Sequence, residues 1–336
     1  MLRQWHFLMN AIIMQKNLAG PVGKLLQNTG APLSPTRQMN AGSGEKPNLG
    51  QAALDRLIQH PDFDHVVMAV ARNAVEEYRQ SWALNRILSD RGRVLTTVAA
   101  LDLYFADPDR AGFSVAHLSK DAAHHGFASL GRISAWAATL RLLGYLAVGV
   151  SGRPQRLVPT QSFFTMFRSR MQRTWQPLAM IHPPAHRAIK FLKEEEFLGH
   201  VAAGFMGPYR NGQRVIDGIP ELAEIVEREG ALCVLLSIML TDAAGRRLSI
   251  AGLAREFAVS RAHVRSILEE AETMGLVKRA QEKAEYYAQP QLTDWMRRFF
   301  AALFQTHIFM IDYALSRHVV ETTDAAEDAR RARGLR

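Results

Sequence analysis

Apolar residues in the second half of the chain recur three and four positions apart, which is the spacing of amphipathic helices. In residues 249–275 this spacing forms two successive helical patterns, interrupted by a short turn at 258–260. Ser249 and Ser260 stand where helix N-caps belong, and Gly275 stands where a helix-terminating glycine belongs. The second helix is expected to bury Val264, Ile267, Leu268, Ala271 and Met274. Residues 276–288 follow as a hairpin, so the pattern predicts helix, turn, helix and hairpin.

An earlier stretch of the chain repeats this pattern. Phe113–Ala122 aligns with Leu248–Phe257 at an offset of 135 residues, and a second match further along has an offset of 131 residues. We therefore expect four extra residues in the first copy, around His124–Phe127. In each copy a long aromatic amphipathic helix follows the hairpin, at about 161–180 and 292–314.

This order of elements resembles the winged helix-turn-helix of bacterial transcription regulators. The long helices beside each copy make the chain similar to the MarR-like group. Members of that family normally carry one such unit per chain and pair through their terminal helices, so two copies in one chain imply a pseudo-dimer. The predicted fold is mainly α, with tandem winged helix-turn-helix units and small β-hairpin wings, joined by long helices.

The predicted organisation has five parts. Residues 1–60 are rich in Gly, Pro and Ser motifs and are expected to be a flexible basic segment without a fold of its own. Residues 61–181 form winged-helix unit 1, and residues 229–315 form winged-helix unit 2. Connecting helices occupy 182–228, and residues 316–336, which are dense in mixed charge, are expected to be a solvated tail.

The charge of the chain favours a polyanionic partner. Its 336 residues have a formal net charge of +9, and residues 122–193 contain ten Lys or Arg without one Asp or Glu. We interpret this stretch as an anion-facing surface. Phosphate contacts dominate the affinity for DNA, whereas base contacts carry the sequence information. We therefore expect copy one mainly to hold phosphates and copy two to discriminate bases.

The candidate DNA-binding residues follow from the resemblance, because the second helix of such a unit enters the major groove with its N-terminal residues toward the bases. Arginine binds guanine through two hydrogen bonds, and cationic wings suit the DNA backbone or the minor groove. In copy two the candidates are Ser260, Arg261, His263 and Arg265 on the helix, with Lys278, Arg279 and Lys283 on the wing. In copy one they are Ser129, Arg132 and Ser134 on the helix, with Arg153 and Arg156 on the wing.

Other classes of protein find little support in the sequence. The single cysteine, Cys233, excludes an internal disulfide and a cysteine-based metal cage. The chain contains no nucleophile motif, carboxylate pair or cofactor loop, so we expect no enzyme activity, no cofactor and no metal. It also contains no run of 18 apolar residues, so we expect no membrane span and a cytoplasmic protein.

Three functions stay open, all of them for proteins built from winged helices. The first is a sequence-specific transcription regulator bound to double-stranded DNA, as a monomeric pseudo-dimer or a homodimer. The second is a plasmid-type replication initiator, and the third is a protein-interaction module. The aromatic helices after the wings are expected to pack the two halves together. The alternative is a gap between them that binds a small apolar or aromatic effector.

Overall fold

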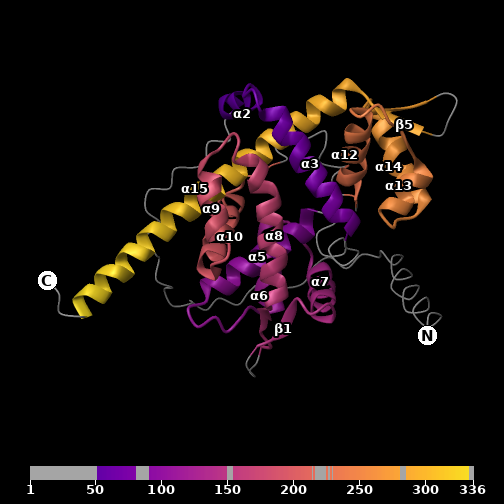
Figure 1. Cartoon of the computed structure of the whole chain (residues 1–336). Coiled ribbons are helices and arrows are strands. Elements are labelled where there is room, and N and C mark those ends of the chain that lie inside the picture. Colours follow the sequence, from indigo (N-terminus) through magenta and orange to yellow (C-terminus); the bar gives the residue numbers. More distant parts are fainter. Residues whose placement is uncertain are drawn as a thin grey trace, which may run out of the picture. The chain divides into compact units, whose positions relative to one another are not determined.

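The computed structural model describes residues 51–80, 91–149, 154–213, 231–280 and 285–332, with the single positions 215, 225, 228 and 230 between them. These residues are mainly helical, and their strands form two small antiparallel sheets (Figure 1). The predicted mainly α class is therefore confirmed. The described residues belong to one compact unit, and their buried side chains form one continuous core.

The first described helices are α2 (Gln51–Ile58), α3 (Phe63–Gln80) and α5 (Arg91–Ala106). Helix α2 packs against the C-terminal helix and buries Leu54. The predicted flexible segment 1–60 is therefore too long, since its last residues are helical and contribute to the core. Residues 1–50 lie outside the described part of the chain.

The first copy of the repeat contains α6 (Val115–His125), α7 (Leu130–Leu142), β1 (Leu146–Val148) and β2 (Leu157–Pro159). Side-chain oxygens cap both helices, because Ser114 accepts the backbone N–H of His117 at 3.1 Å and Ser129 accepts that of Arg132 at 3.4 Å. Strands β1 and β2 pair antiparallel, and Phe113 forms a further bridge to Leu157.

The second copy contains α12 (Ala231–Asp242), β3 (Leu248–Ser249), α13 (Ile250–Glu256), α14 (Arg261–Thr273), β4 (Val277–Arg279) and β5 (Glu285–Ala288), with sheet order β3-β5-β4. The predicted caps are confirmed, because Ser249 accepts the N–H of Gly252 and Ser260 accepts the N–H of His263, both at 3.1 Å. Helix α14 buries the predicted residues except Met274, which is half-buried at the helix end.

The four-residue difference between the copies is also confirmed. Helix α6 has 11 residues and the matching α13 has seven, so the first copy is longer by four. The extra residues lie at the end of α6, where His124 and His125 precede Gly126. The sequence offset therefore corresponds to one additional helical turn.

Four further helices pack against one another or against α5: α8 (Gln161–Leu178), the short α9 (Pro184–Phe191), α10 (Glu195–Arg210) and α15 (Pro290–Ala332), which is the long yellow helix in Figure 1. The predicted tail at 316–336 is helical as far as Ala332, and of its described side chains His318 is buried, whereas those at 316, 317, 319, 320 and 323 are exposed as expected. By length and composition alone Pro290–Val320 also suits a membrane span, yet half of its apolar window is buried inside the protein. Such a helix is weak evidence for a membrane, because core helices share this composition.

Gly112 permits the bridge between Phe113 and Leu157. Its φ is +99°, and a Cβ at this position would lie 2.4 Å from the carbonyl oxygen of Leu157. We expect Gly112→Ala to lower the free energy of unfolding by about 2 kcal/mol, because the backbone angle and the contact both oppose a side chain. Urea unfolding measures the loss. Gly131→Ala is the control, since nothing lies within 4 Å of its added Cβ, and an equal loss there would contradict this account.

Candidate nucleic-acid interface

The N-terminal half of α14 carries two exposed arginines among the predicted DNA contacts. Arg261 and Arg265 lie one turn apart and are both exposed, while Val264 and Ile267 on the opposite face are buried. His263 is half-buried, and Ser260 caps the helix with its side-chain oxygen. The helix N-terminus also has positive partial charge, which favours an approaching phosphate. The two arginines are therefore free to reach a ligand along this face.

Two acids beside this face are neutralised by arginines from other parts of the chain. Arg79 of α3 binds Glu256 at the end of α13, with Nε 2.7 Å from the carboxylate. Arg228 pairs with Glu270 of α14 and donates to the hydroxyl of Ser266 at 2.8 Å. These pairs fix α13 and α14 to their neighbours. They also reduce the negative charge near the exposed arginines.

The small sheet of copy two adds an outward row of cationic and aromatic side chains. Tyr287 on β5 lies opposite Lys278 on β4, and the guanidinium of Arg247 lies 5.0 Å from the centre of the Tyr287 ring. The preceding residue, Tyr286, is buried, so alternation along the strand turns Tyr287 outward. Sequence reasoning missed Arg247 and Tyr287, because only strand pairing brings residues 40 positions apart together.

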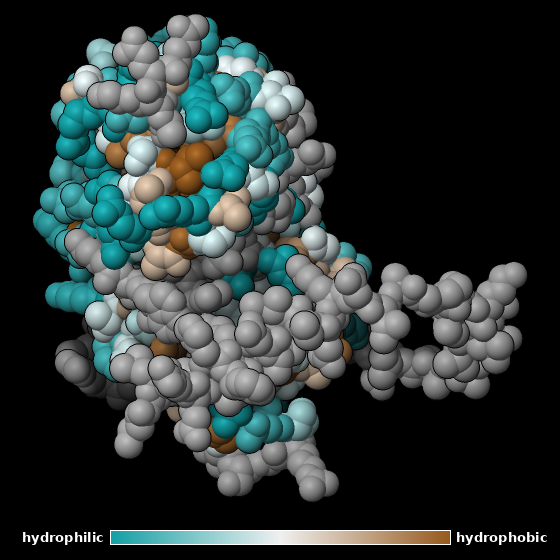
Figure 2. Space-filling view, turned by 90° about the vertical axis from the view of Figure 1, so that its right-hand side faces the viewer, coloured by the Kyte–Doolittle hydropathy of each residue, from teal (hydrophilic) through white to brown (hydrophobic). Residues whose placement is uncertain are grey.

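The remaining wing candidates of copy two lie in different settings. Arg279 is exposed at the end of β4, and its backbone N–H donates to the carboxylate of Glu272 at 3.0 Å. Lys283 lies outside the described residues. Figure 2 faces the side on which α13 and α14 lie in Figure 1, and its coloured surface there is mostly hydrophilic with small apolar areas.

Copy one presents a different surface on its equivalent helix. Arg132 and Ser134 are exposed on α7, and Ser129 caps the helix. The same helix also exposes Leu130 to 62% and Leu142 to 77%, which leaves an apolar component that α14 lacks. This face is therefore less suited to a polyanion than the corresponding face of copy two.

The β1–β2 hairpin of copy one, which was predicted to be a wing, uses its described arginine within the protein. Arg156 pairs with Asp107 at 2.7 Å and donates to the carbonyl oxygen of Gly112 at 3.1 Å. A phosphate would have to compete with these partners for the guanidinium. Arg153, the other wing candidate, lies outside the described residues.

The acid-free stretch 122–193 does not form one unpaired cationic surface. Arg170 pairs with Glu77 of α3 at 3.4 Å, and Arg168 donates to the carbonyl oxygens of Leu192 and Lys193 at the end of α9. Acids from distant parts of the chain thus supply the charges that the stretch itself lacks. Its exposed basic side chains include Arg132, Arg141, Arg187, Lys190 and Lys193.

No protein-family model, no curated protein and no solved structure matches this chain. Within the described ranges, no group of three His, Cys, Asp or Glu side chains is placed to hold a metal ion. The candidate interface therefore stands on the geometry of its own residues.

Proposed function

We propose that the protein is a cytoplasmic, sequence-specific DNA-binding regulator of transcription with two winged helix-turn-helix units in one chain. The observation that carries this proposal is the exposed pair Arg261 and Arg265 on the capped N-terminal half of α14. In this function α14 enters the major groove, and its arginines bind guanine edges. The order of helices and strands around α14 supports the proposal, since it matches the order expected of such a unit.

The outward row on the sheet supports the same interface. In the proposed complex, Arg247 and Lys278 bind phosphates beside the groove that α14 occupies, and Tyr287 packs against the sugar–phosphate backbone. Phosphate contacts of this kind set the register of the protein on DNA. The proposal therefore divides copy two between base contacts on α14 and backbone contacts on the sheet.

A protein-interaction role is the second candidate, and it applies to copy one. Its support is the exposure of Leu130 and Leu142 on α7, at the positions where copy two carries polar or charged side chains. Apolar side chains of this size gain little from a phosphate backbone and more from a protein surface. In this function copy one binds a protein partner while copy two binds DNA.

The proposal is tested by selecting DNA fragments from genomic and random pools across a salt series. With roughly six phosphates neutralised, the logarithm of affinity should fall against the logarithm of salt with a slope near −5. We expect the double variant Arg261→Ala/Arg265→Ala to bind the selected fragment about 100-fold more weakly, and scrambled DNA much less affected. Fluorescence anisotropy measures both affinities.

The matched control is Arg56→Ala/Arg72→Ala, which removes the same charge from exposed positions on α2 and α3. We expect this control to change the affinity by less than about threefold, because long-range attraction alone is weakly affected by two distant charges. Equal losses on selected and scrambled DNA would contradict base reading by α14. Absence of salt-dependent binding would contradict the proposed function.

A further inference from the structure

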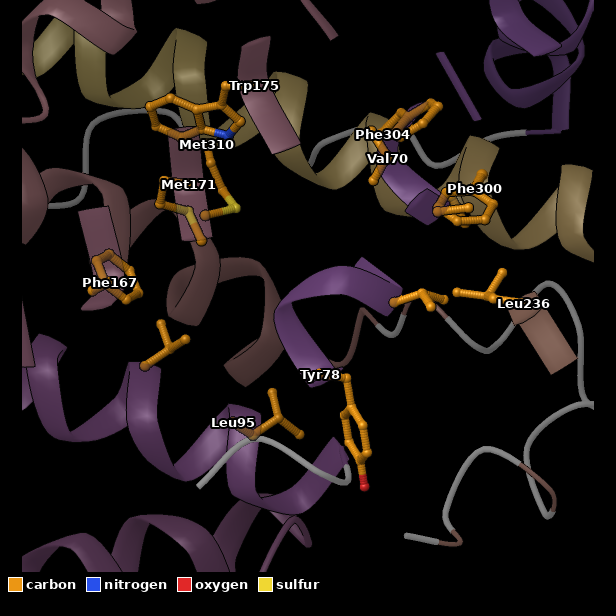
Figure 3. Close-up of a cluster of buried hydrophobic side chains, with 14 of the residues drawn as sticks. Val70, Tyr78, Leu95, Phe167, Met171, Trp175, Leu236, Phe300, Phe304 and Met310 are labelled. Carbon is orange, nitrogen blue, oxygen red and sulfur yellow. The ribbon is translucent and has the colours of Figure 1, made fainter. Parts of the chain in front are cut away.

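A cavity of about 330 Å³ lies inside the helical core, away from α14. Its walls come from α3, α5, α8, α10, α12 and α15 and are predominantly apolar. Figure 3 shows several of the wall residues, among them Val70, Tyr78, Phe167 and Met310. Pockets that bind small molecules usually have volumes of roughly 300–1,000 Å³, so this cavity has room for one small ligand.

One buried polar side chain gives this apolar cavity a group that can form a hydrogen bond with a ligand. His307 of α15 lines the cavity and is only 8% exposed. Its Nδ1 lies 3.0 Å from the indole Nε1 of Trp175. Since an indole N–H can only donate, Nδ1 is the acceptor and the neutral ring carries its proton on Nε2.

The Nε2–H group of His307 is left for a ligand. Trp175, which occupies Nδ1, does not line the cavity, and among the described residues the hydrogen bond at Nδ1 is the only one that His307 makes. Burial, followed by the positive charge of Arg170, lowers the pKa of His307 to about 3, so the ring is a neutral donor near pH 7. Nε2 is not among the fully enclosed polar atoms of the described residues that lack a partner, so it has exposed surface that a ligand oxygen can reach, and such a ligand would add one hydrogen bond.

The described wall contains four charged side chains, of which two form an ion pair. Arg170 lies in the wall and is paired there with Glu77, so the two charges offset each other. Arg91 and Arg173 also contribute to the lining, so an anionic ligand is the comparison that a test must include. The wall in contact with the bulk of a ligand is apolar and aromatic.

We propose that this cavity binds a small, uncharged, largely aromatic molecule with one acceptor oxygen, which accepts a hydrogen bond from Nε2 of His307. Ligand binding at this site does not require the proposed function in DNA binding, and it is measured without DNA. Failure of either proposal therefore leaves the other standing.

Isothermal titration of the full-length protein with two probes of the same shape tests the site. 2-Acetonaphthone carries a ketone oxygen, whereas 2-ethylnaphthalene has the same ring and chain length without it. We expect one ketone molecule per chain, bound about fivefold more tightly than the hydrocarbon, because one hydrogen bond distinguishes them. No binding of the ketone up to its solubility limit, or equal binding of both probes, would overturn the proposal. Tighter binding of 2-naphthoate would overturn the uncharged class.

Substitutions in the cavity wall test whether the ligand binds at this site. Ala74→Phe inserts a ring into the cavity from α3 and is expected to abolish binding of 2-acetonaphthone, whereas His307→Phe is expected to remove only the preference for the ketone. His186→Phe, at an exposed position on α9, is the control and should bind as the unaltered protein does. Retained binding by a folded Ala74→Phe variant would overturn the site.

The rate at which the Cys233 thiol reacts with a reagent tests the same site in the unaltered protein. Cys233 is the only cysteine of the chain and lines the same cavity. We expect bound 2-acetonaphthone to slow the reaction of its thiol with methyl methanethiosulfonate, which forms a mixed disulfide and releases methanesulfinate. An unchanged rate at saturating ketone would place the ligand elsewhere and overturn the site.

Discussion

Replacing Arg210 by Met is expected to lower the free energy of unfolding by about 3–5 kcal/mol, because the variant leaves two largely buried carboxylates without their cation. Arg210 of α10 donates from Nη1 to Asp102 of α5 at 2.6 Å. Its Nε and Nη2 donate to both oxygens of Asp121 of α6, at 3.1 and 3.0 Å. The guanidinium thereby joins three helices.

The pKa values explain why this loss is large. Burial raises the pKa of Asp102, although the charge and hydrogen bond of Arg210 act to lower it. Burial alone would lower the pKa of Arg210, but hydrogen bonds and attraction to the two carboxylates outweigh it, and that pKa is raised. Without the arginine, Asp102 loses its main favourable partner and keeps the repulsion of Asp121. The buried charge of Asp102 then favours the unfolded or the protonated form of the protein.

Urea unfolding at pH 7 measures this effect, with Arg79→Met as the control. The Arg79 side chain is 41% exposed in its pair with Glu256, and exposed pairs contribute at most about 1 kcal/mol. The triple variant Arg210→Met/Asp102→Asn/Asp121→Asn should recover part of the loss, since it removes the buried charges as well. A loss of 1 kcal/mol or less for Arg210→Met would contradict the account. Because α6 belongs to copy one, hydrogen exchange should show copy one loosened more than α14.

The parts of the fold that follow local rules could be predicted from the sequence. Ser249 and Ser260 cap helices because a short hydroxyl side chain reaches the N–H three residues ahead, whatever surrounds it. Gly126 and Gly275 have φ of +71°, which glycine adopts at a helix end without strain. The helix pairs and hairpins were therefore predictable within a few residues.

Features that depend on distant parts of the chain were not predictable in this way. Residues 316–332 carry mixed charge and resemble a tail, and most of their described side chains are exposed, yet His318 packs against Phe191 and Phe197 of α9 and α10. The charged stretch 122–193 looked unpaired because Glu77, the partner of Arg170, lies 93 residues away. No local pattern reports such a partner.

The candidate site also contains residues that local spacing predicts and residues that only distant contacts bring together. Arg261 and Arg265 could be selected because helical spacing places them opposite the buried face of α14. Arg247 could not, since it lies before the helix pair and meets Tyr287 only through the pairing of β3 with β5. The cavity was expected only as a gap between aromatic helices, because side-chain volumes and the orientation of His307 are settled by packing.

The burial of His307 predicts a strong dependence of stability on pH. The pKa of His307 is about 3 in the folded protein against 6.5 as the ordinary value. Between these pH values the unfolded chain binds a proton that the folded protein excludes, so stability is fully present above pH 6.5 and falls as the pH falls. At about 1.36 kcal/mol per pH unit, the loss from pH 6.5 to 3.5 is about 4 kcal/mol.

Comparison with His307→Phe isolates this contribution, because both proteins share every carboxylate that titrates in the same range. The Phe variant also leaves the indole N–H of Trp175 without its acceptor, which lowers stability by a nearly constant amount and leaves the slope with pH unaffected. We therefore expect the difference between the two unfolding free energies, measured in urea at half-unit steps of pH, to change on acidification by about 4 kcal/mol in total, in favour of His307→Phe. His186→Phe should follow the unaltered protein, since that side chain is exposed. Parallel pH profiles for the unaltered protein and His307→Phe would mean that this imidazole is not excluded from protonation in the folded state.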